Sequence, residues 1–591
     1  MKKAKTAAKA KESSKSKAKV ASKAAAPALL AEKPKIEKKP KKIVHEDAES
    51  MAKRQREISV SEFFAKNRHL LGFDNPKKAL LTAVKEAVDN SLDACEEAGI
   101  LPSITVKLER LSAPVKQMTA EEEAEALKSK KGKAVIPTER FHLSIIDNGP
   151  GIVSNQIPKI FAKLLYGSKF HRLKMSRGQQ GIGISAAGMY GQITTGKPVK
   201  VTSKLPKKDK ASFLELIIDT KTNKPEVLQE KEVNWAYKST SGTCVEITLE
   251  GRYQKGKQSV DEFILLNTLS NPHAEFTFID PLGESFHYPR KSDEIAELPN
   301  EIKPHPHGVE LGRFRQMASD TEYKTLKQFL TKEFSRVSEK VADEILKEAG
   351  VKDAKIANMR PEELNKVHEA IPKIAIMSPP TDCIVPIGED LIKETLAAQT
   401  KAEFYVATTR SPSVYRGNPF LVECAIAFGG ELSSDEQVQV FRFANRVPLQ
   451  FQPSACCSFK VITKIDWKNY GLNQQKNSVP VGPVAVLLHV ASVWVPFTSE
   501  SKEAIADYPE IKQELRLAIQ ECARQLSIHL RRQRRADEEN RKSSYIDTYI
   551  PFIGEALQEM LKLSEPQKEK VIATLRTTLE KGKIEDGKTN E

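Results

Sequence analysis

One polar stripe on a helix constrains this chain more than any other feature. The stretch LLTAVKEAVDNSLDACEEAG, residues 80–99, has apolar residues at every fourth position from Leu80 to Leu92. This spacing predicts a helix with one buried face. Gly99 and Pro102 follow the last apolar residue and are expected to end the helix.

Three polar side chains of this helix, Glu86, Asn90 and Asp93, stand at i, i+4 and i+7 and therefore share one side. The amide oxygen of Asn90 is a candidate ligand to Mg²⁺, which takes oxygen ligands and usually keeps several waters. Glu86, one turn earlier, is placed to orient or deprotonate such a water. A solvated helix face, or a buried Asn bonded to backbone, explains the same residues if no other motif supports them.

A second motif follows a predicted strand. Residues 104–108 alternate apolar and polar, and 140–146 (RFHLSII) read as another strand. The latter ends in Asp147-Asn148-Gly149-Pro150-Gly151, a tight turn in which the two glycines allow the backbone to approach a ligand closely.

A third motif is glycine-rich. A basic loop opens at Gly167-Ser168-Lys169-Phe170 and leads to RGQQGIGIS, residues 177–185, before the helical AAGMYGQI. A glycine loop that enters a helix N-terminus suits phosphate, because bare N–H groups and the helix dipole face it. The loop is not a P-loop, since no Gly-Lys-Ser/Thr follows, and no strand immediately precedes it as in a dinucleotide motif. Strands are then predicted at 199–203, 212–218 and 243–249, the last beginning at Gly242-Thr243.

The order of these motifs resembles the GHKL ATPase family and its Bergerat fold. The resemblance implies that Glu86 is the general base for the attacking water, that Asn90 is a Mg²⁺ ligand and that Asp147 accepts the adenine amino group. Asp93 matches no catalytic position and is expected to support its neighbours. The other residues implied in ATP binding are Gly149 and Gly151 at the base, Ser168, Lys169 and Phe170 in the lid, Gly178, Gln179, Gln180, Gly181, Ile182, Gly183, Ile184 and Ser185 around the phosphates, and Thr243 on the adenine side.

The segments after residue 300 indicate which branch of this family the chain resembles. Residues 300–380 read as a small helical module, which resembles the helix-two-turn-helix insertion of topoisomerase VI B subunits. Alternating strands return at 403–446 and are followed by NRVPL, WKNYGL and a long charged helix at 509–541. Together these segments resemble an archaeal-type topoisomerase VI B subunit over residues 58–541. The resemblance implies that Lys468, within WKNYGL, reaches the γ-phosphate, where a lysine acts as a point charge.

The resulting expectation is an α+β protein with a Bergerat ATP-binding sandwich, a helical insertion and an α/β transducer domain ending in a long helix. The expected division is a disordered Lys-rich tail at 1–57, an ATPase domain at 58–302, the helical domain at 303–380, the transducer at 381–545 and a partner-docking segment at 546–591. Residues 112–137 read as an inserted loop.

Charge is concentrated at the N-terminus. Residues 1–42 hold 15 Lys and 3 Glu, a net +12 of the +15 carried by the whole chain. Such a tail attracts a polyanion without sequence specificity, or serves only as a solubilising arm. The chain shows no run of 18 apolar residues, no signal-peptide core and no CxxC spacing among its seven cysteines. We therefore expect no membrane partner and a cytoplasmic, nucleoid-associated protein.

The resemblance implies an ATP-driven switch with ATP and Mg²⁺ as its cofactors. Two ATPase domains would dimerise on ATP binding and couple this closure to passage of one DNA duplex through another, which relaxes supercoiled DNA. No Asp-x-Asp occurs in the 591 residues, although cleavage in this class typically uses such a carboxylate cluster with a nucleophilic tyrosine. A separate A subunit is therefore expected to cut double-stranded DNA, in an A₂B₂ heterotetramer.

Other classes share part of the pattern. A ninety-kilodalton heat-shock chaperone or a MutL-like repair switch has the same kind of ATP site, but the chaperone lacks the helical insertion and WKNYGL, and no endonuclease metal motif is visible here. A gyrase B subunit would continue into a metal-binding cleavage domain, and a sensor kinase would need a phosphoacceptor helix pair before the ATPase. A DNA-binding scaffold would explain the basic tail but not the ordered ATP motifs.

Overall fold

The computed structural model describes residues 48–54, 58–112, 138–167, 169, 172–179, 181–219 and 221–588. Residues 1–57 and 58–591 form two separate units. In the first unit only helix α1 (Ala48–Arg54) is described, and it lies within the segment expected to be disordered. Its sequence, AESMAKR, consists mostly of good helix formers, which is the physical reason for the difference. The rest of that tail and residues 113–137 of the predicted insertion lie outside the described residues.

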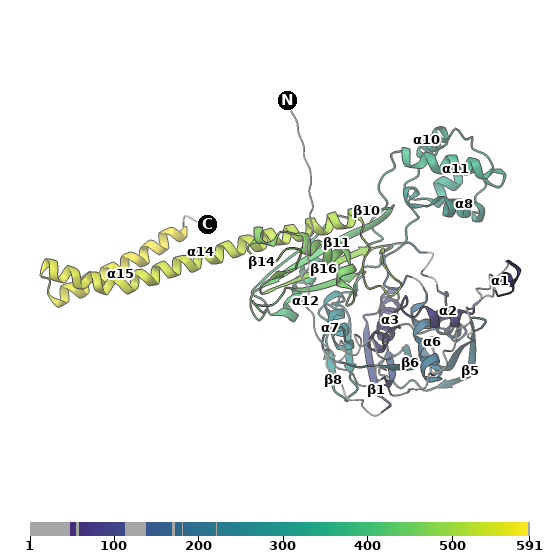
Figure 1. Ribbon diagram of the computed structural model, residues 1–591, viewed down its shortest axis with the longest axis horizontal. Helices are drawn as coiled ribbons and strands as arrows, with labels where there is room; N and C mark the ends of the chain where they lie inside the picture. The colour runs from purple at the N-terminus through teal and green to yellow at the C-terminus, as the bar shows by residue number, and fades with distance from the viewer. Residues whose placement is uncertain are drawn as a thin grey trace, which may run out of the picture. The chain divides into compact units, whose positions relative to one another are not determined.

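The first sheet of the second unit has the strand order β5-β4-β3-β6-β2-β1-β7-β8 (Figure 1). Neighbouring strands are antiparallel except β1 and β7, which run parallel. Burial alternates along β1 and β3, as expected for a sheet with one packed face. The strands are β1 (Ser103–Arg110), β2 (Glu139–Ile146), β3 (Val199–Lys204), β4 (Ala211–Asp219), β5 (Lys224–Val233), β6 (Gly242–Gly251), β7 (Glu275–Ile279) and β8 (Ser285–Tyr288).

Helices α3 (Pro76–Glu97), α6 (Gly183–Thr195) and α7 (Val260–Ser270) pack against this sheet (Figure 1). The Asn75 side chain caps α3 by accepting from the Lys77 N–H, so the helix begins one turn earlier than the apolar spacing alone indicates. The apolar positions of the predicted face are buried, which confirms it. The shorter elements on this side are α2 (Val60–Lys66), η1 (Ser154–Gln156) and α5 (Ile157–Phe161).

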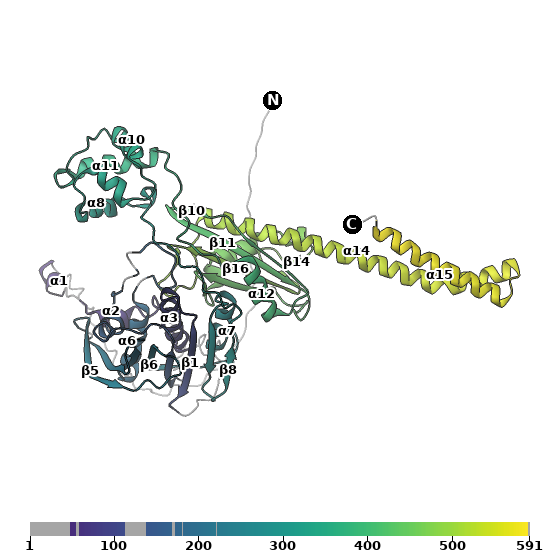
Figure 2. The ribbon, with the colours of Figure 1, turned by 180° about the vertical axis from the view of Figure 1, so that it is seen from behind.

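A compact helical group follows, visible in both views (Figures 1 and 2). It has its own apolar core, built around the stacked and edge-on rings of Phe314, Phe329 and Phe334. Its helices are α8 (Leu311–Asp320), α9 (Leu326–Glu333), α10 (Glu339–Ala349) and α11 (Pro361–Ala370), with short turns η3 (Pro306–Gly308), η4 (Ile356–Asn358) and η5 (Ile371–Lys373). The helical character predicted for 303–380 is therefore confirmed.

The second sheet has the order β10-β11-β16-β12-β13, with β9 also paired to β11. Every residue of β16 is buried, because α12, α13 and α14 contribute to the apolar clusters around the sheet. The strands are β9 (Phe404–Thr409), β10 (Ser413–Tyr415), β11 (Asn418–Phe428), β12 (Gln439–Ala444), β13 (Val447–Pro448) and β16 (Val484–Ser492), and a separate pair is β14 (Asn473–Gln474) with β15 (Pro480–Val481). The remaining helices here are α12 (Glu389–Thr400), η6 (Pro453–Ala455), α13 (Cys457–Lys464) and η7 (Trp467–Tyr470).

Helix α14 (Pro509–Leu561) is 53 residues long and is followed by α15 (Glu565–Lys588), which lies beside it (Figures 1 and 2). Its first turns are buried through Ile511, Leu515 and Ile519, as the apolar spacing predicts. The helix continues twenty residues beyond the predicted end, through Pro551 to Leu561, and this added part packs against α15. Within the described part of the chain, no helix is long and apolar enough to cross a membrane.

Candidate functional site

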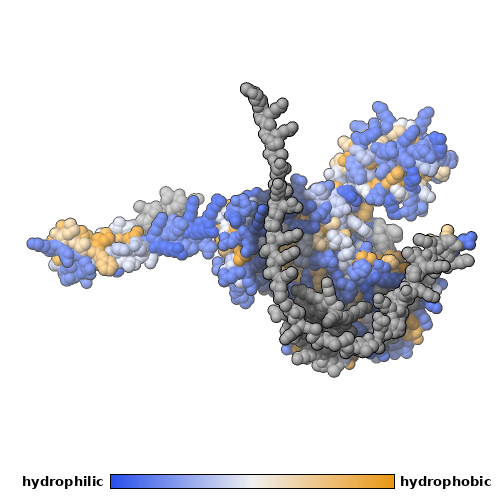
Figure 3. Space-filling view, in the orientation of Figure 1, coloured by the Kyte–Doolittle hydropathy of each residue, from blue (hydrophilic) through white to orange (hydrophobic). Residues whose placement is uncertain are grey.

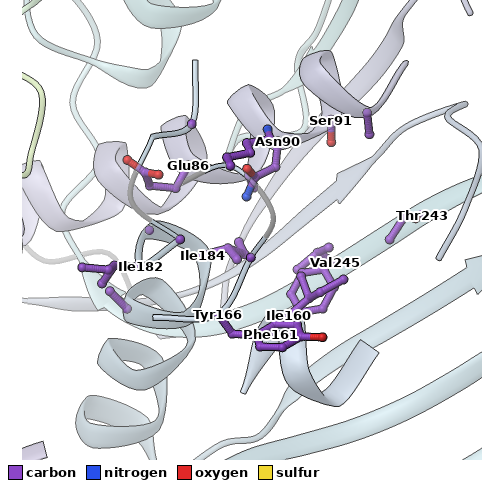
Figure 4. Close-up of a pocket in the computed structure, with 18 of the residues that line it drawn as sticks. Glu86, Asn90, Ser91, Ile160, Phe161, Tyr166, Ile182, Ile184, Thr243 and Val245 are labelled. Carbon is purple, nitrogen blue, oxygen red and sulfur yellow. The ribbon is translucent and has the colours of Figure 1, made fainter. Parts of the chain in front are cut away.

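A cavity of about 550 Å³ lies between α3, α5, β6 and the glycine-rich loop that enters α6 (Figure 4). This volume is within the usual range for a small-molecule site. In Figure 4, Glu86, Asn90 and Ser91 project from α3 on one side of the cavity, and Thr243 and Val245 lie on the strand opposite. The structure thus brings together segments that are far apart in the sequence.

Asp147 forms the polar end of the cavity. Its Oδ1 accepts hydrogen bonds from the backbone N–H groups of Gly149 and Thr243, both at 3.0 Å, and its Oδ2 accepts one from Ser91 Oγ at 2.9 Å. Burial raises the pKa of Asp147, although these three donors favour its ionised form. Since a carboxylate offers about four lone-pair sites, the fixed group keeps acceptor capacity for a ligand amino group.

An apolar wall continues from Asp147. Ile160 and Phe161 of α5, the ring of Tyr166 and Val245 of β6 line this part of the cavity (Figure 4). The Tyr166 hydroxyl donates to Gln156 Oε1 at 2.8 Å, which fixes the ring at the mouth. A slot with apolar sides and one carboxylate at its end is suited to a flat, amino-bearing heterocycle.

Glu86 lies toward the other end of the cavity, 8% exposed. Gly183, the first residue of α6, approaches it so closely that a Cβ atom there would stand 1.8 Å from Glu86 Oε2. Only glycine therefore fits position 183 while the carboxylate keeps this place. Position 151, in the turn that follows Asp147, also requires glycine, because its φ is +72° and a Cβ would lie 2.2 Å from the Lys204 carbonyl oxygen.

The glycine-rich loop supplies donors for an anion. Most of its described residues line the cavity, and Gly183 starts α6, so the helix N-terminus faces the same space. Gln179 is 5% exposed and its Nε2 has no hydrogen-bond acceptor among the described residues. An unpartnered buried donor beside a helix N-terminus fits a phosphate chain.

The donor set for a metal ion is sparse. Among the described residues no group of three or more His, Cys, Asp or Glu side chains is placed to hold a metal. Asn90 offers an amide oxygen to the cavity, next to Glu86 on α3 (Figure 4). This fits Mg²⁺, which is commonly bound by one or two protein oxygens together with substrate phosphates and water.

Asp93, which matches no catalytic position, belongs to a buried ionic network. Its carboxylate bonds to the ammonium group of Lys169 and, at 2.9 Å, to Nη1 of Arg177. Arg177 also bonds both oxygens of Glu96, at 2.6 and 2.7 Å, and the side chain of Asn271. Burial would raise the pKa of Glu96, but the Arg177 guanidinium holds this pKa well below its usual range. The network ties the segment 172–179 to α3.

Not every residue predicted for the site faces the cavity. Gly149 lies behind Asp147, and the Ser185 hydroxyl donates to the Ile160 and Lys163 carbonyls, so it holds α5 against α6. Ser168, Phe170 and Gln180 lie outside the described residues. The predicted residues that line the cavity are Glu86, Asn90, Asp147, Gly151, Lys169, Gly178, Gln179, Gly181, Ile182, Gly183, Ile184 and Thr243.

Lys468, predicted to reach the γ-phosphate, is not among the residues that line the cavity. It is exposed on η7, where its neighbour Trp467 is fully buried and donates from Nε1 to the Ile462 carbonyl at 2.9 Å. The Arg534 side chain of α14 bonds the Gly471 carbonyl next to this turn. WKNYGL is therefore anchored by packing against α14, which leaves Lys468 outside the cavity lining.

Lys502 reaches the cavity from the segment between β16 of the second sheet and α14. It lines the cavity, is 3% exposed, and its Nζ lies 3.4 Å from Glu86 Oε1 and 3.9 Å from Asp89 Oδ2. Burial disfavours its charge, but the carboxylates of Glu86 and Asp89 outweigh burial and raise the pKa of Lys502. Burial also raises the pKa of Asp89, to about 6.

Sequence reasoning missed Ser91, Arg177 and Lys502. Ser91 directly follows Asn90, so its place beside the motif was a signal that could have identified it. Arg177 was included only as the start of the glycine loop, and its buried partners lie more than 80 residues away. Lys502 lies 416 residues from Glu86 in a segment, TSESKEAIA, that carries no recognised motif.

Family comparisons agree with this geometry. Residues 379–542 match the family model "Topoisomerase VI B subunit, transducer", and residues 79–244 match "Histidine kinase-, DNA gyrase B-, and HSP90-like ATPase". The chain is 43% identical over 527 residues to the B subunit of type 2 DNA topoisomerase 6 from Archaeoglobus fulgidus, covering 89% of this chain and 83% of that protein. The chain belongs to the topoisomerase VI B subunit family.

Other family members give the same result. The Methanosarcina acetivorans protein is 45% identical over 537 residues, covering 90% of this chain and 82% of that protein. The Pyrococcus horikoshii protein is 36% identical over 560 residues, covering 86% and 93%. These matches confirm the predicted family and α+β fold class, and they disfavour the chaperone and repair-protein alternatives.

Solved structures of more distant proteins also overlap with the chain. The B subunit of DNA gyrase from Myxococcus xanthus superposes with a TM-score of 0.40 at 9% identity, covering 79% of this chain and 95% of that one. The ATPase region of Saccharomyces cerevisiae topoisomerase II gives 0.37 at 10% identity, covering 81% and 98%. These values are too low to establish a common fold by themselves.

Proposed function

We propose that the cavity binds and hydrolyses ATP and that Glu86 activates the water that attacks the terminal phosphate. The observation that supports this most is that Glu86, Asn90, Asp147 and the glycine-rich loop line one cavity. Asp147 and the apolar wall would receive adenine, and the loop at the N-terminus of α6 would receive the phosphates. Glu86, nearly buried beside Gly183, is placed to take a proton from a water aimed at the last phosphate.

Asn90 would hold Mg²⁺, which when bound neutralises charge on the phosphates. Its amide lies on α3 next to Glu86 (Figure 4). Lys169 and Gln179 add a cation and an amide donor on the loop side. These residues bind and orient the phosphate chain, and the buried network through Asp93 and Arg177 keeps the loop in register with α3.

Lys502 replaces Lys468 in the proposed contact with the terminal phosphate. It belongs to the segment between β16 and α14, so a contact here would couple the nucleotide to the second sheet and its long helix. A triphosphate would draw the ammonium group away from α3, and hydrolysis would remove that attraction. The proposed division places the ATPase domain at 58–302, the helical domain at 303–380 and the transducer at 381–545.

As a family member, the chain is the ATPase subunit of a type II topoisomerase. We propose that ATP binding closes a dimer of ATPase domains around double-stranded DNA, that a separate A subunit cuts the duplex in an A₂B₂ assembly, and that the complex associates with the nucleoid. An apolar patch on α14 and α15 (Figure 3) offers a docking face for that subunit. The most exposed apolar residues of these helices are Tyr545, Phe552, Met560 and Leu561, at 61–79% exposure.

The test is ATP-dependent relaxation of supercoiled DNA by the purified chain, with and without an A subunit from a close relative. Glu86→Gln should bind a non-hydrolysable ATP analogue but lose hydrolysis and relaxation by at least about a hundred-fold, as expected when a general base is removed. Glu97→Gln is the matched control, because Glu97 is on the same helix, faces solvent and, among the described residues, forms ion pairs with Arg172 and Lys174.

Relaxation that needs the A subunit and is lost only in Glu86→Gln would support the proposal. Relaxation or cleavage by the chain alone would refute the separate cutting subunit. Hydrolysis that survives Glu86→Gln would refute the assignment of the base.

A further inference from the structure

The segment around Lys502 is clamped along one side of α3. Lys78 Nζ lies 2.6 Å from Glu503 Oε1, and Lys85 Nζ donates to the carbonyls of Ser501 and Lys502, both at 3.3 Å. Lys502 itself has a left-handed backbone, with φ of +52°. A non-glycine residue keeps this conformation only where its surroundings impose it, so the segment is held in place rather than loosely packed.

The ammonium group of Lys502 stands between two carboxylates of α3. Glu86 lies 3.4 Å away through Oε1 and 3.5 Å away through Oε2, and Asp89 lies 3.9 Å away through Oδ2. Both carboxylates are nearly buried, at 8% and 1% exposure, so water screens these contacts weakly. In this arrangement the ammonium group of Lys502 is paired with the carboxylate of Glu86, the proposed catalytic base.

Unlike Glu86, Asp89 has no proposed role in the hydrolysis of ATP. Neither of its carboxylate oxygens accepts a hydrogen bond from any described residue. A buried charge without hydrogen bonds is costly and persists only beside an opposite charge. The cations that act on Asp89 are Lys502, Lys85 and, least, Arg177. Lys85 is already engaged with two carbonyls, and Arg177 with Asp93 and Glu96.

We propose that Asp89 is a positioning residue that holds Lys502 on α3, over Glu86, until a terminal phosphate competes for the lysine. The inference rests on the proposed function, since it assumes a triphosphate in the cavity. Asp89 then determines how strongly the site distinguishes ATP from ADP. Only a nucleotide with a γ-phosphate can compensate for the loss of both carboxylate contacts of Lys502. The departure of Lys502 then leaves Glu86 free to act on water.

The experiment measures the binding of ADP and of β,γ-imido-ATP to the full-length chain by calorimetry. Asp89→Asn removes the charge and keeps the shape, so it should raise affinity for the triphosphate analogue about ten-fold more than affinity for ADP, as expected for loss of a buried ion pair. Asp89→Glu retains the charge and should restore the original ratio. Glu97→Gln, on the exposed side of α3, should leave both affinities unchanged.

A second set of variants separates holding of Lys502 from direct repulsion between Asp89 and phosphate. In Lys502→Met the ratio of the two affinities should no longer respond to Asp89→Asn, because the residue through which Asp89 acts is gone. A ratio that still changes ten-fold in the Lys502→Met background would overturn the inference. So would an unchanged ratio in Asp89→Asn alone.

Amine labelling without nucleotide gives an independent readout. Acetylation of Lys502, followed by mass spectrometry, should be several-fold faster in Asp89→Asn than in the original chain, with exposed Lys468 as the internal reference. Equal labelling rates would contradict the proposal. If the original chain binds neither nucleotide, the proposed function fails first, whereas normal binding with an unchanged ratio refutes only the role of Asp89.

Discussion

Replacement of Arg177 by methionine should destabilise the nucleotide-binding half of the chain by about 3 to 5 kcal/mol, the usual cost of breaking a buried ion pair. Arg177 is 4% exposed and bonds Asp93, both oxygens of Glu96 and the side chain of Asn271. Asp93 would keep Lys169, and Glu96 would keep His273 at 2.7 Å, so neither acid is left without a partner. These remaining partners favour the lower end of that range.

The loss should also depend on pH. Although burial favours the neutral acids, Lys169 and Arg177 hold the pKa of Asp93 below its usual range, and Arg177 does the same for Glu96. A depressed acid pKa stabilises the fold above the pKa of the unfolded chain, near 4, and this stabilisation is lost as pH falls. Without Arg177 both pKa values rise, so the difference in unfolding free energy between the two proteins should shrink as pH falls below about 4.

Urea-dependent hydrogen exchange on peptides from α3 measures this free energy in the full chain. Arg172→Met is the matched control, because its guanidinium is exposed and lies 4.0 Å from Glu97, a surface pair worth at most about 1 kcal/mol. A loss below about 1 kcal/mol in Arg177→Met, or a difference that widens as pH falls below about 4, would contradict this prediction.

Three further predictions follow from packing and charge. Gly183→Ala should abolish ATP hydrolysis in a steady-state assay, since its Cβ would stand 1.8 Å from Glu86 Oε2, whereas Gly312→Ala, which has open space at its Cβ, should hydrolyse ATP normally. Phe314→Ala should cost the helical group about 3 to 5 kcal/mol, seen as lost exchange protection at 311–370 with α3 unaffected, and equal protection would contradict a separate core. Glu423→Gln should cost about 2 to 4 kcal/mol at pH 7, because a buried carboxylate that accepts four hydrogen bonds is replaced. Although burial favours its neutral form, these donors hold the pKa of Glu423 below its usual value, so that cost should shrink in thermal unfolding as pH falls below about 4, and a cost that stays constant there would argue against an ionised group.

Local pattern predicted the elements that carry the site. The apolar period of α3 placed Glu86 and Asn90 on one helix, and the strand before Asp147 was found within one residue of its observed start. Helix α5 ends at Phe161, and Leu165 has φ of +60°. There the Leu164 N–H bonds the side chain of Asn223, a contact that no local pattern reports.

Short-range sequence patterns were enough to identify the residues that could perform the chemistry, since the helix period, the glycine turns and their order depend on neighbours a few positions apart. Which lysine meets Glu86 depends instead on long-range packing. Lys468 belongs to a conspicuous motif, but burial of Trp467 makes that motif a packing element. Lys502 lies 416 residues from Glu86 and reaches it because the segment before α14 packs along α3. A contact over that separation depends on how two sheets and their helices pack together, which no short stretch of sequence encodes.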